Sequence, residues 1–226
     1  MDHRIPHPWN VTPSEALSIQ SALKKRLFLS PIDKEIRLVG GGDVAYSKRD
    51  DRLFGAMVVL SLPDLAVVDE AWHVGVVRFP YIPGFLSFRE GPILLEVAKK
   101  ICQSPDVWIF DGQGIAHPRG IGLASHMGLL LDCPSIGCAK KRLLGGHNRV
   151  GHRKGDFEFL VTAQGAIGAA VRTRNATKPL YVSPGFRIHV EESVELVLRT
   201  CEKYRTPEPL RRSHLLSNRI RKEMAG

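Results

Sequence analysis

Three acidic residues occupy places where a carboxylate is costly to bury without a partner. Asp43 lies inside a predicted strand rich in glycine and valine, and Asp111 directly follows the apolar run 107–110. Glu90 lies near the start of the helix predicted between them. Mg²⁺ binds carboxylate oxygens, usually together with a substrate phosphate. Any one of these acids alone is better explained by backbone amides or a lysine that satisfies it, but the three together predict a divalent-cation site.

A lysine ends the next predicted strand. Lys140 follows the buried run 135–139, and parallel strands end at the same edge of a sheet, so we expect it near Asp111. There it would contact a phosphate or help to position the attacking water. Its structural alternative is a salt bridge to one of the carboxylates, and the two roles are compatible.

The segment Pro80-Tyr81-Ile82-Pro83-Gly84 predicts a stiff loop. Its two prolines restrict the backbone, and Gly84 allows a sharp exit. A rigid loop that presents an aromatic and an apolar side chain is suited to wedging into a base stack. The alternative is a surface loop whose Tyr81 packs back onto the core.

Glycines and histidines surround the acidic positions. Gly112 and Gly137 would allow a flat ring to approach the backbone, although glycine at a strand end is often only a turn. His117 follows Asp111 by six residues and can reach back towards it. His214 lies in a basic tail, so only tertiary structure could bring it close. We interpret His126 as structural.

The elements that must position these residues change character along the chain. A helix over about 12–29 precedes three strands, at 36–46, 56–60 and 66–77, which form a predicted antiparallel meander. Helices and strands then alternate, which predicts parallel pairing: a helix over 85–102 interrupted by Gly91-Pro92, a strand over 107–110, a helix over 121–131 and a strand over 135–139. The remainder is a basic loop over about 145–155, a strand over 180–182, a helix over 190–204 and a basic tail over about 206–226.

This order of elements is the layout of ribonuclease H-like domains. The predicted fold is therefore α/β, with a mixed sheet that joins an antiparallel meander to parallel β-α units and is flanked by helices. The chain of 226 residues is long enough for one such domain with a substantial core, and we predict a single domain over 1–226.

Bulk composition excludes several classes of protein. No apolar run approaches the roughly 18 residues of a membrane span, and the first ten residues, MDHRIPHPWN, do not resemble a signal peptide. The four cysteines are scattered, without the spacing of a zinc site or of a disulfide scaffold. We expect reduced thiols in a cytoplasmic protein.

The positive charge is concentrated in the second half of the chain. The net charge is +9, and residues 1–110 contain equal numbers of acidic and basic residues, so the whole excess lies in 111–226. A one-sided excess fits a polyanion partner, but a solubilising surface explains it equally well.

Several motifs resemble the endonuclease V family. They are the block 80–90 (PYIPGFLSFRE), then 111–114 with 117–119, 122–128 and 136–140, in family order and spacing, within a similarity that covers about 12–215. The resemblance implies a ribonuclease H-like fold and a DNA repair endonuclease that depends on Mg²⁺, with Mn²⁺ able to substitute. Its expected partner is DNA with deaminated bases, cut at the second phosphodiester bond 3′ to deoxyinosine, and some relatives act on inosine in RNA. We expect a monomer.

The resemblance also assigns roles to residues. It implies metal-associated carboxylates at Asp43, Glu90 and Asp111, with His214 as a weaker ligand, and an active-site lysine at Lys140. It implies a strand-separating wedge of Pro80, Tyr81 and Ile82, and a hypoxanthine pocket that involves Gly84, Leu86, Gly112, His117 and Gly137. The sequence departs from the family at Gln113 and Phe186, where histidine is frequent.

Two other functions remain open at this stage. A ribonuclease H-like nuclease directed at flaps or junctions would also suit a wedge. A non-catalytic nucleic-acid-binding module would need vestigial carboxylates, which the retention of all three acids with Lys140 argues against. The sequence does not determine whether DNA or RNA is the working substrate, which lesions are recognised or how many metal ions take part.

Overall fold

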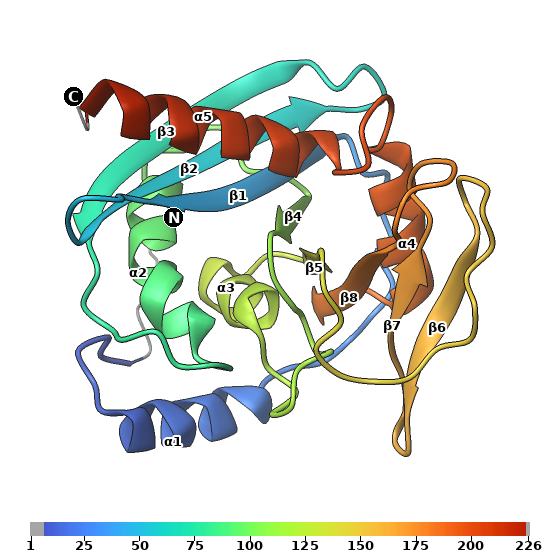
Figure 1. Ribbon diagram of the computed structural model, residues 1–226, viewed down its shortest axis with the longest axis horizontal. Coiled ribbons are helices and arrows are strands. Elements are labelled where there is room, and N and C mark those ends of the chain that lie inside the picture. The colour runs from blue at the N-terminus through green and yellow to red at the C-terminus, as the bar shows by residue number, and fades with distance from the viewer. Residues whose placement is uncertain (1–6, 225–226) are drawn as a thin grey trace.

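A mixed sheet forms the centre of the computed structural model, which describes residues 7–224 (Figure 1). Its strands within these residues are β1 (Leu38–Tyr46), β2 (Arg52–Ser61), β3 (Val67–Val76), β4 (Val107–Phe110), β5 (Ser135–Ala139), β6 (Phe157–Thr162), β7 (Gly165–Val171) and β8 (Leu180–Phe186). They lie in the order β3-β2-β1-β4-β5-β8-β7-β6. The central pairs β1–β4 and β4–β5 are parallel, and the other pairs are antiparallel.

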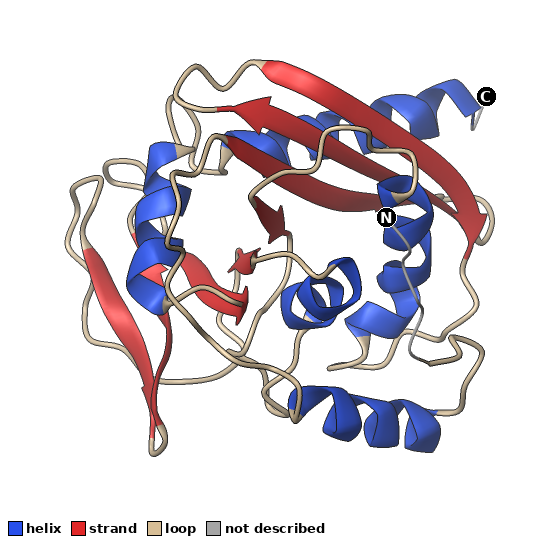
Figure 2. Ribbon diagram, turned by 180° about the vertical axis from the view of Figure 1, so that it is seen from behind, coloured by secondary structure: helices blue, strands red, loops and turns tan. Residues whose placement is uncertain are grey.

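Helices cover both faces of this sheet (Figure 2). They are α1 (Pro13–Lys24), α2 (Leu86–Ala98), α3 (Leu123–Leu131), α4 (Val190–Arg199) and α5 (Glu208–Met224). One apolar core lies between the sheet and α4 with α5, and a second lies between the sheet and α2 with α3. Strand β2 is buried along almost its whole length, because both cores use it.

The close packing of α5 on β1 depends on a glycine. A Cβ atom at Gly41 would lie 2.2 Å from the backbone carbonyl carbon of Pro209, so any larger residue would push α5 away from the strand. The glycine-rich start of β1 therefore lets α5 lie along β1 and β2, as Figure 1 shows.

The N-terminal helix supports the entrance to α2. Thr12 and Glu15 form a capping box that starts α1. Its buried Ala16 packs in a third cluster with Phe79, Phe85 and Phe88. The helix ends at Lys24 and not near residue 29 as predicted, because residues 27–30 continue without helical hydrogen bonding.

The predicted ribonuclease H-like architecture is confirmed, including the meander and the parallel β-α units. The interruption predicted at Gly91-Pro92 is wrong, since α2 runs through both residues. Proline removes one backbone donor from the helix, and the burial of Phe88, Ile93 and Leu94 on the same helix offsets that loss.

The C-terminal third differs most from prediction. The segment 206–226 was expected to be a basic tail, but residues 208–224 form α5. Its prolines precede or occupy the first turn, where a backbone N–H is not needed. Buried residues at helical spacing, including Leu210, Ser213, Ser217 and Ile220, face the sheet. The strands β6 and β7 were not predicted, and the helix predicted over 190–204 ends at Arg199.

Other expectations have simpler outcomes. No helix within residues 7–224 has the length and apolar character needed to cross a membrane. Cys102, Cys133, Cys138 and Cys201 are free thiols. The segment 145–155 contains no helix or strand, as predicted. Residues 1–6 and 225–226 of the predicted domain lie outside the described residues.

Candidate active site

Two of the predicted acids come from neighbouring parallel strands. Gly42 of β1 pairs with Phe110 of β4 in register, so the next residues, Asp43 and Asp111, follow side by side at the centre of the sheet. This edge, where the carboxyl ends of parallel strands meet, is where sites in α/β proteins gather. The topology therefore brings together two acids that are separated by 68 positions in the sequence.

Asp43 is held by residues from α5. Its Oδ2 accepts a hydrogen bond of 2.9 Å from Ser217 Oγ and lies 3.1 Å from His214 Nδ1. The Asp43 side chain is only 10% exposed, whereas that of His214 is 58% exposed. The hydrogen bond to Asp43 raises the pKa of His214. The predicted proximity of His214 to the site is thus seen in the structure, and tertiary packing of α5 produces it.

Asp111 and Lys140 form the expected ion pair. Lys140 Nζ donates to Asp111 Oδ2 at 2.8 Å, and both side chains remain partly exposed. Partial burial works against the charge on Lys140, but the bond to Asp111 and the nearby Asp43 outweigh it and raise the pKa of Lys140. The lysine is therefore a fixed positive charge that still reaches solvent.

Glu90 lies beneath these two acids on α2. Its Oε1 accepts a hydrogen bond of 2.7 Å from the hydroxyl of Tyr46. Burial, together with the charges of Asp43 and Asp111, raises the pKa of Glu90 to about 8. This shift in pKa shows that the three carboxylates share one electrostatic environment. Without a bound cation, Glu90 is protonated at neutral pH.

The donor set fits Mg²⁺ better than a softer metal. Asp43 and Asp111 supply carboxylate oxygens, whereas burial raises the pKa of the nearby Cys138 thiol, which therefore offers no thiolate. Within residues 7–224, no three His, Cys, Asp or Glu side chains are already arranged around a common metal position. Mg²⁺ often binds through one or two carboxylates, with water and substrate phosphate as its other ligands. A carboxylate pair that lacks a third preformed ligand matches that mode of binding.

The loop 80–84 projects from the protein beside these acids. Tyr81 is 76% exposed, so it does not pack back onto the core as the structural alternative required. Ile82 is half-buried and packs against the cluster around Phe79 and Phe85. Gly84 has a φ of +85°, which favours glycine, and its carbonyl accepts hydrogen bonds from Gln20 and Arg119. The loop is thus anchored at its base and exposed at its tip.

A mainly apolar cavity of about 220 Å³ lies between this loop and Gly112, the residue that follows Asp111. Leu86 and Gly112 line it, as predicted, together with His117. Other residues that line the cavity include the whole loop 80–84 and Leu123 at the start of α3. Ala139 and Leu143, on either side of Lys140, line it as well. A flat, partly apolar ring would fit this cavity with its edge against the backbone around Gly112.

Two of the residues predicted for this pocket have distinct surroundings. His117 is 4% exposed, and burial together with Arg119 lowers its pKa to about 4, so it is neutral at physiological pH. Gly137 does not line the cavity. A Cβ atom there would lie 2.3 Å from the backbone nitrogen of Gly114, so Gly137 allows the 112–114 backbone to pack closely on β5.

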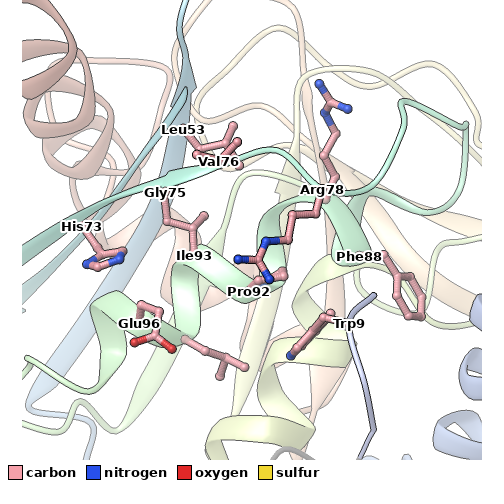
Figure 3. Close-up of a pocket in the computed structure, with 12 residues that line it drawn as sticks. Trp9, Leu53, His73, Gly75, Val76, Arg78, Phe88, Pro92, Ile93 and Glu96 are labelled. Atoms are coloured by element: carbon pink, nitrogen blue, oxygen red, sulfur yellow. The ribbon is translucent and has the colours of Figure 1, made fainter. Parts of the chain in front are cut away.

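A larger cavity than this one lies elsewhere. It has a volume of about 370 Å³ and lies between the edge strand β3 and α2, with Trp9, Arg78 and Phe88 among its lining residues (Figure 3). No sequence neighbour of Asp43 or Asp111 lines it, whereas Gly112, which follows Asp111, lines the smaller cavity. Cavity volume alone would therefore select a site away from the acidic cluster. The chemistry of the side chains instead selects the smaller cavity, which adjoins that cluster.

Sequence reasoning missed four residues that support the site. Tyr46 contacts Glu90, Ser217 contacts Asp43, and Gln20 with Arg119 holds the carbonyl of Gly84. Tyr46 lies three residues after Asp43 in the same strand, so its side chain points to the opposite face of the sheet, where α2 packs. The others reach the site only through tertiary structure. Gln113, one of the departures from the family pattern, donates to the carbonyl of Lys141, and Phe186 is buried against Phe28.

The architecture and the site together define a class of protein. A ribonuclease H-like sheet carries paired carboxylates and a lysine at the ends of its parallel strands. An exposed aromatic loop and a slot for a flat ring lie beside them. This combination is that of a ribonuclease H-like nuclease.

The model of the family described as endonuclease V matches residues 21–215. The endonuclease V of Kosmotoga olearia is 45% identical over 224 residues, which cover 98% of each chain. The crystal structure of endonuclease V from Streptomyces avermitilis superposes with a TM-score of 0.91 at 38% identity and covers 98% of both chains. The chain belongs to the endonuclease V family and is an endonuclease.

One related structure contains nucleic acid. Endonuclease V of Ciona intestinalis was crystallised with a 23mer DNA containing an inosine followed by a ribo-adenosine. It superposes with a TM-score of 0.83 at 29% identity, covering 95% of the present chain and all of the other.

Proposed function

We propose that this protein is a DNA repair endonuclease that recognises deoxyinosine and hydrolyses the second phosphodiester bond on its 3′ side with Mg²⁺. The observation that carries the proposal is the adjacency of the Asp43–Asp111 pair to a ring-sized cavity below an exposed wedge. Membership in the endonuclease V family and the inosine-containing DNA bound by a relative support it.

Asp43 and Asp111 hold the cation in this proposal, with Glu90 behind them. Mg²⁺ bound there would activate water and stabilise negative charge on the phosphoryl group and the leaving oxygen. Mn²⁺ prefers similar ligands and would substitute. A cation bound there would favour the ionised form of Glu90. His214 remains a weaker candidate ligand, since its ring already contacts Asp43.

Lys140 and Ser217 keep the reacting groups in place. Lys140 presents its charge beside Asp111, where it offsets charge that develops on a phosphoryl oxygen in the transition state. Ser217 donates to Oδ2 of Asp43 and limits its rotation. Both contacts exist before substrate binds, so little reorganisation is needed during the reaction.

The wedge and cavity account for lesion selectivity in the same proposal. Tyr81, with Pro80 and Ile82, holds the duplex open while the deaminated base turns into the cavity, at an unstacking cost of a few kcal/mol. A mispaired base costs less to extrude. Hypoxanthine presents a carbonyl oxygen where adenine has an amino group, so a backbone N–H near Gly112 distinguishes the two bases.

The cellular setting follows from the same proposal. Four free cysteines, two of them buried, suit a reducing cytoplasm. We place the enzyme there as a monomer, because all of the proposed chemical groups come from one chain.

The test is cleavage of matched oligonucleotides. Duplexes of the same sequence, with and without a single deoxyinosine, are incubated with the protein in Mg²⁺, in Mn²⁺ and in a chelator, and the cut positions are mapped. We expect metal-dependent cleavage only of the inosine duplex, at the second phosphodiester bond on the 3′ side of the lesion. Equal cleavage of both duplexes, or preferential cleavage of flaps and junctions, would identify a structure-directed nuclease. Absence of cleavage with retained binding would identify a non-catalytic module.

An RNA substrate is tested in the same series. An oligonucleotide with inosine in RNA is compared with its DNA counterpart at equal enzyme concentration. Faster cleavage of the RNA would reassign the working substrate while leaving the proposed chemistry unchanged.

A further inference from the structure

The positive charge of the protein is concentrated in one segment. Residues 140–178 contain nine lysines and arginines but only two acidic residues, Asp156 and Glu158. This segment therefore contributes +7 of the net charge of +9. It includes the basic loop 145–155, the hairpin of β6 and β7, and the turn that leads to β8.

This segment concentrates cations that have no acidic partner. Elsewhere within residues 7–224, some exposed cations form ion pairs, as in Arg37–Glu35 and Lys99–Glu96, and others, such as Lys24 and Lys25, form none. Seven exposed cations of the segment form no ion pair within the described chain, and one of them, Lys154, donates to the carbonyl of Cys201. The other six are Lys141, Arg142, Arg149, Arg153, Arg174 and Lys178. We call these six residues the basic surface.

Neither acid of the segment neutralises this surface. Asp156 accepts a hydrogen bond from the backbone N–H of Arg153 through Oδ2, at 2.8 Å. Glu158 accepts a weaker one from the side chain of Asn148, at 3.4 Å. Both acids stabilise the fold of the loop, and the guanidinium and ammonium groups remain available to another molecule.

Hydrogen bonds hold the loop in a defined place. The buried guanidinium of Arg172 donates to the carbonyls of Val150 and Gly151. The backbone N–H of Lys154 donates to Asn175, and that of Ala176 donates to the carbonyl of His152. These contacts place the loop beside the turn 174–176, so Arg153 and Arg174 come from adjacent segments.

The loop also continues directly from the candidate active site. Ala139, next to Lys140, pairs with Tyr181 of β8. The ring of Tyr181 lies 5.8 Å from that of His147, and Gly146 bridges to Val161 of β6. Figure 1 shows this part of the chain alongside β6, at the end of the sheet opposite β3. A polyanion bound at Lys140 can therefore extend along this part of the protein.

We propose that the basic surface binds the phosphates of the duplex that flanks the lesion, outside the base pocket and the scissile bond. This inference rests on the proposed function, because it extends the same bound nucleic acid. Unpaired, exposed cations that adjoin a phosphodiester-cleaving site complement the charge of a DNA backbone. Each phosphate that they neutralise releases counterions, so binding depends on salt with a slope of about −0.9 per neutralised phosphate in a log–log plot.

The test removes three charges in each of two variants. The first combines Arg149→Gln, Arg153→Gln and Arg174→Gln. The matched control combines Lys34→Gln, Arg37→Gln and Lys99→Gln, which removes the same net charge from cations that have acidic partners. Lys34 and Arg37 precede the start of β1, away from the strand ends that carry Asp43 and Asp111. Thermal melts establish that both variants fold.

The readout is single-turnover cleavage of an inosine duplex at varied enzyme and salt concentrations. For a long duplex, we expect the first variant to raise the enzyme concentration at half-maximal rate. We also expect the salt slope to fall by about 0.9 for each phosphate that the variant no longer neutralises. Its maximal rate, and its behaviour on a short duplex that covers only the lesion and the cut bond, should match wild type. The control should match wild type throughout.

Two results would overturn the inference: a salt slope unchanged in the first variant, or an equal reduction in the control, which would reflect net charge alone. If the wild-type protein does not cleave inosine DNA, the proposed function fails by itself. The same salt series, followed by fluorescence anisotropy on undamaged duplex, then still measures whether the basic surface binds DNA. An unchanged slope there contradicts the inference independently of cleavage.

Discussion

Two polar centres within the described chain differ in the charge and the solvent access of their ionisable groups. In the first, Asp43, Glu90 and Asp111 lie together at the ends of β1 and β4 and on α2, with Lys140 as the ion-pair partner of Asp111. In the second, which we call the histidine cluster, His7 and His126 lie against Trp9 and Phe88. Their Nε2 atoms are 2.8 Å apart, and His126 is fully buried.

The difference lies in charge and in access to solvent. Burial lowers the pKa of both histidines, to about 3 for His126, so the histidine cluster is neutral and enclosed by rings. The carboxylates repel one another, and Asp111 and Lys140 remain open to solvent. A neutral, enclosed cluster stabilises the fold. The carboxylate cluster carries more negative than positive charge, so it can bind a cation. Substitutions in the two centres should therefore affect different properties.

The largest expected effect is on catalysis, from Asp111→Asn. The substitution removes a ligand charge at the proposed cation site, so the single-turnover cleavage rate should fall by about 10³-fold or more. Stability should change by less than about 1 kcal/mol, because the ion pair with Lys140 is partly exposed. Cleavage assays and denaturant unfolding measure the two effects.

Asp132→Asn is the matched control for this prediction. Asp132 also forms an exposed ion pair, with Arg187 at 2.7 Å, but it follows α3 and lies outside the carboxylate cluster. Its substitution should leave cleavage unchanged. Wild-type activity in Asp111→Asn would remove Asp111 from the proposed mechanism.

The second effect is on stability, from Trp9→Ala in the histidine cluster. The indole stacks on His126 with centroids 5.3 Å apart and contacts Gly91 of α2. Removing a packed ring leaves a cavity, so the free energy of unfolding should fall by about 3 kcal/mol. Cleavage by the folded variant should match wild type. Trp72, which is 40% exposed on β3, provides the control, because Trp72→Ala should cost less than about 1 kcal/mol.

The smallest effect is a dependence of stability on pH. His126 has a folded-state pKa of about 3, below its ordinary value of 6.5, so the unfolded chain binds a proton that the folded chain excludes. Its contribution to stability is complete above about pH 6.5 and is lost as the pH falls towards 3. Near pH 5, the loss should be on the order of 1–2 kcal/mol.

The variant His126→Phe isolates this contribution from that of the carboxylates. Denaturant unfolding at several pH values should show a smaller acid-induced loss in the variant than in wild type. His152, which is exposed, serves as the control, because His152→Gln should leave the wild-type pH profile unchanged. Identical profiles for wild type and His126→Phe would show that the histidine cluster does not exclude protons.

Much of the fold and of the candidate site could be predicted from the sequence because the signals are local. Asp43 and Asp111 each stand next to apolar strand residues, and Lys140 ends the neighbouring strand, so strand order alone predicts their proximity. The stiffness of the loop 80–84 follows from its prolines. Each of these inferences needs only short-range pattern and the geometry of a parallel sheet.

The features that sequence reasoning missed depend on long-range packing. His214 and Ser217 lie in a segment so rich in arginine that its apolar stripe is weak, and the pattern of α5 therefore resembles a tail. Strand β7 contains alanine and glycine at positions where apolar alternation would normally identify a strand. Strand β6 (FEFLVT) is an exception, because it is rich in aromatic and β-branched residues and could have been found. His7 and His126 meet across 119 positions, so no local pattern indicates the histidine cluster.

The docking of α5 on β1 has a consequence for the order in which the protein is made. Asp43 precedes His214 by 171 residues and Ser217 by 174 residues, and both of these later residues contact its carboxylate. A nascent chain that has not yet reached residue 217 cannot present a fully supported Asp43. The support of Asp43 is therefore completed by a helix that is synthesised after every strand of the described sheet.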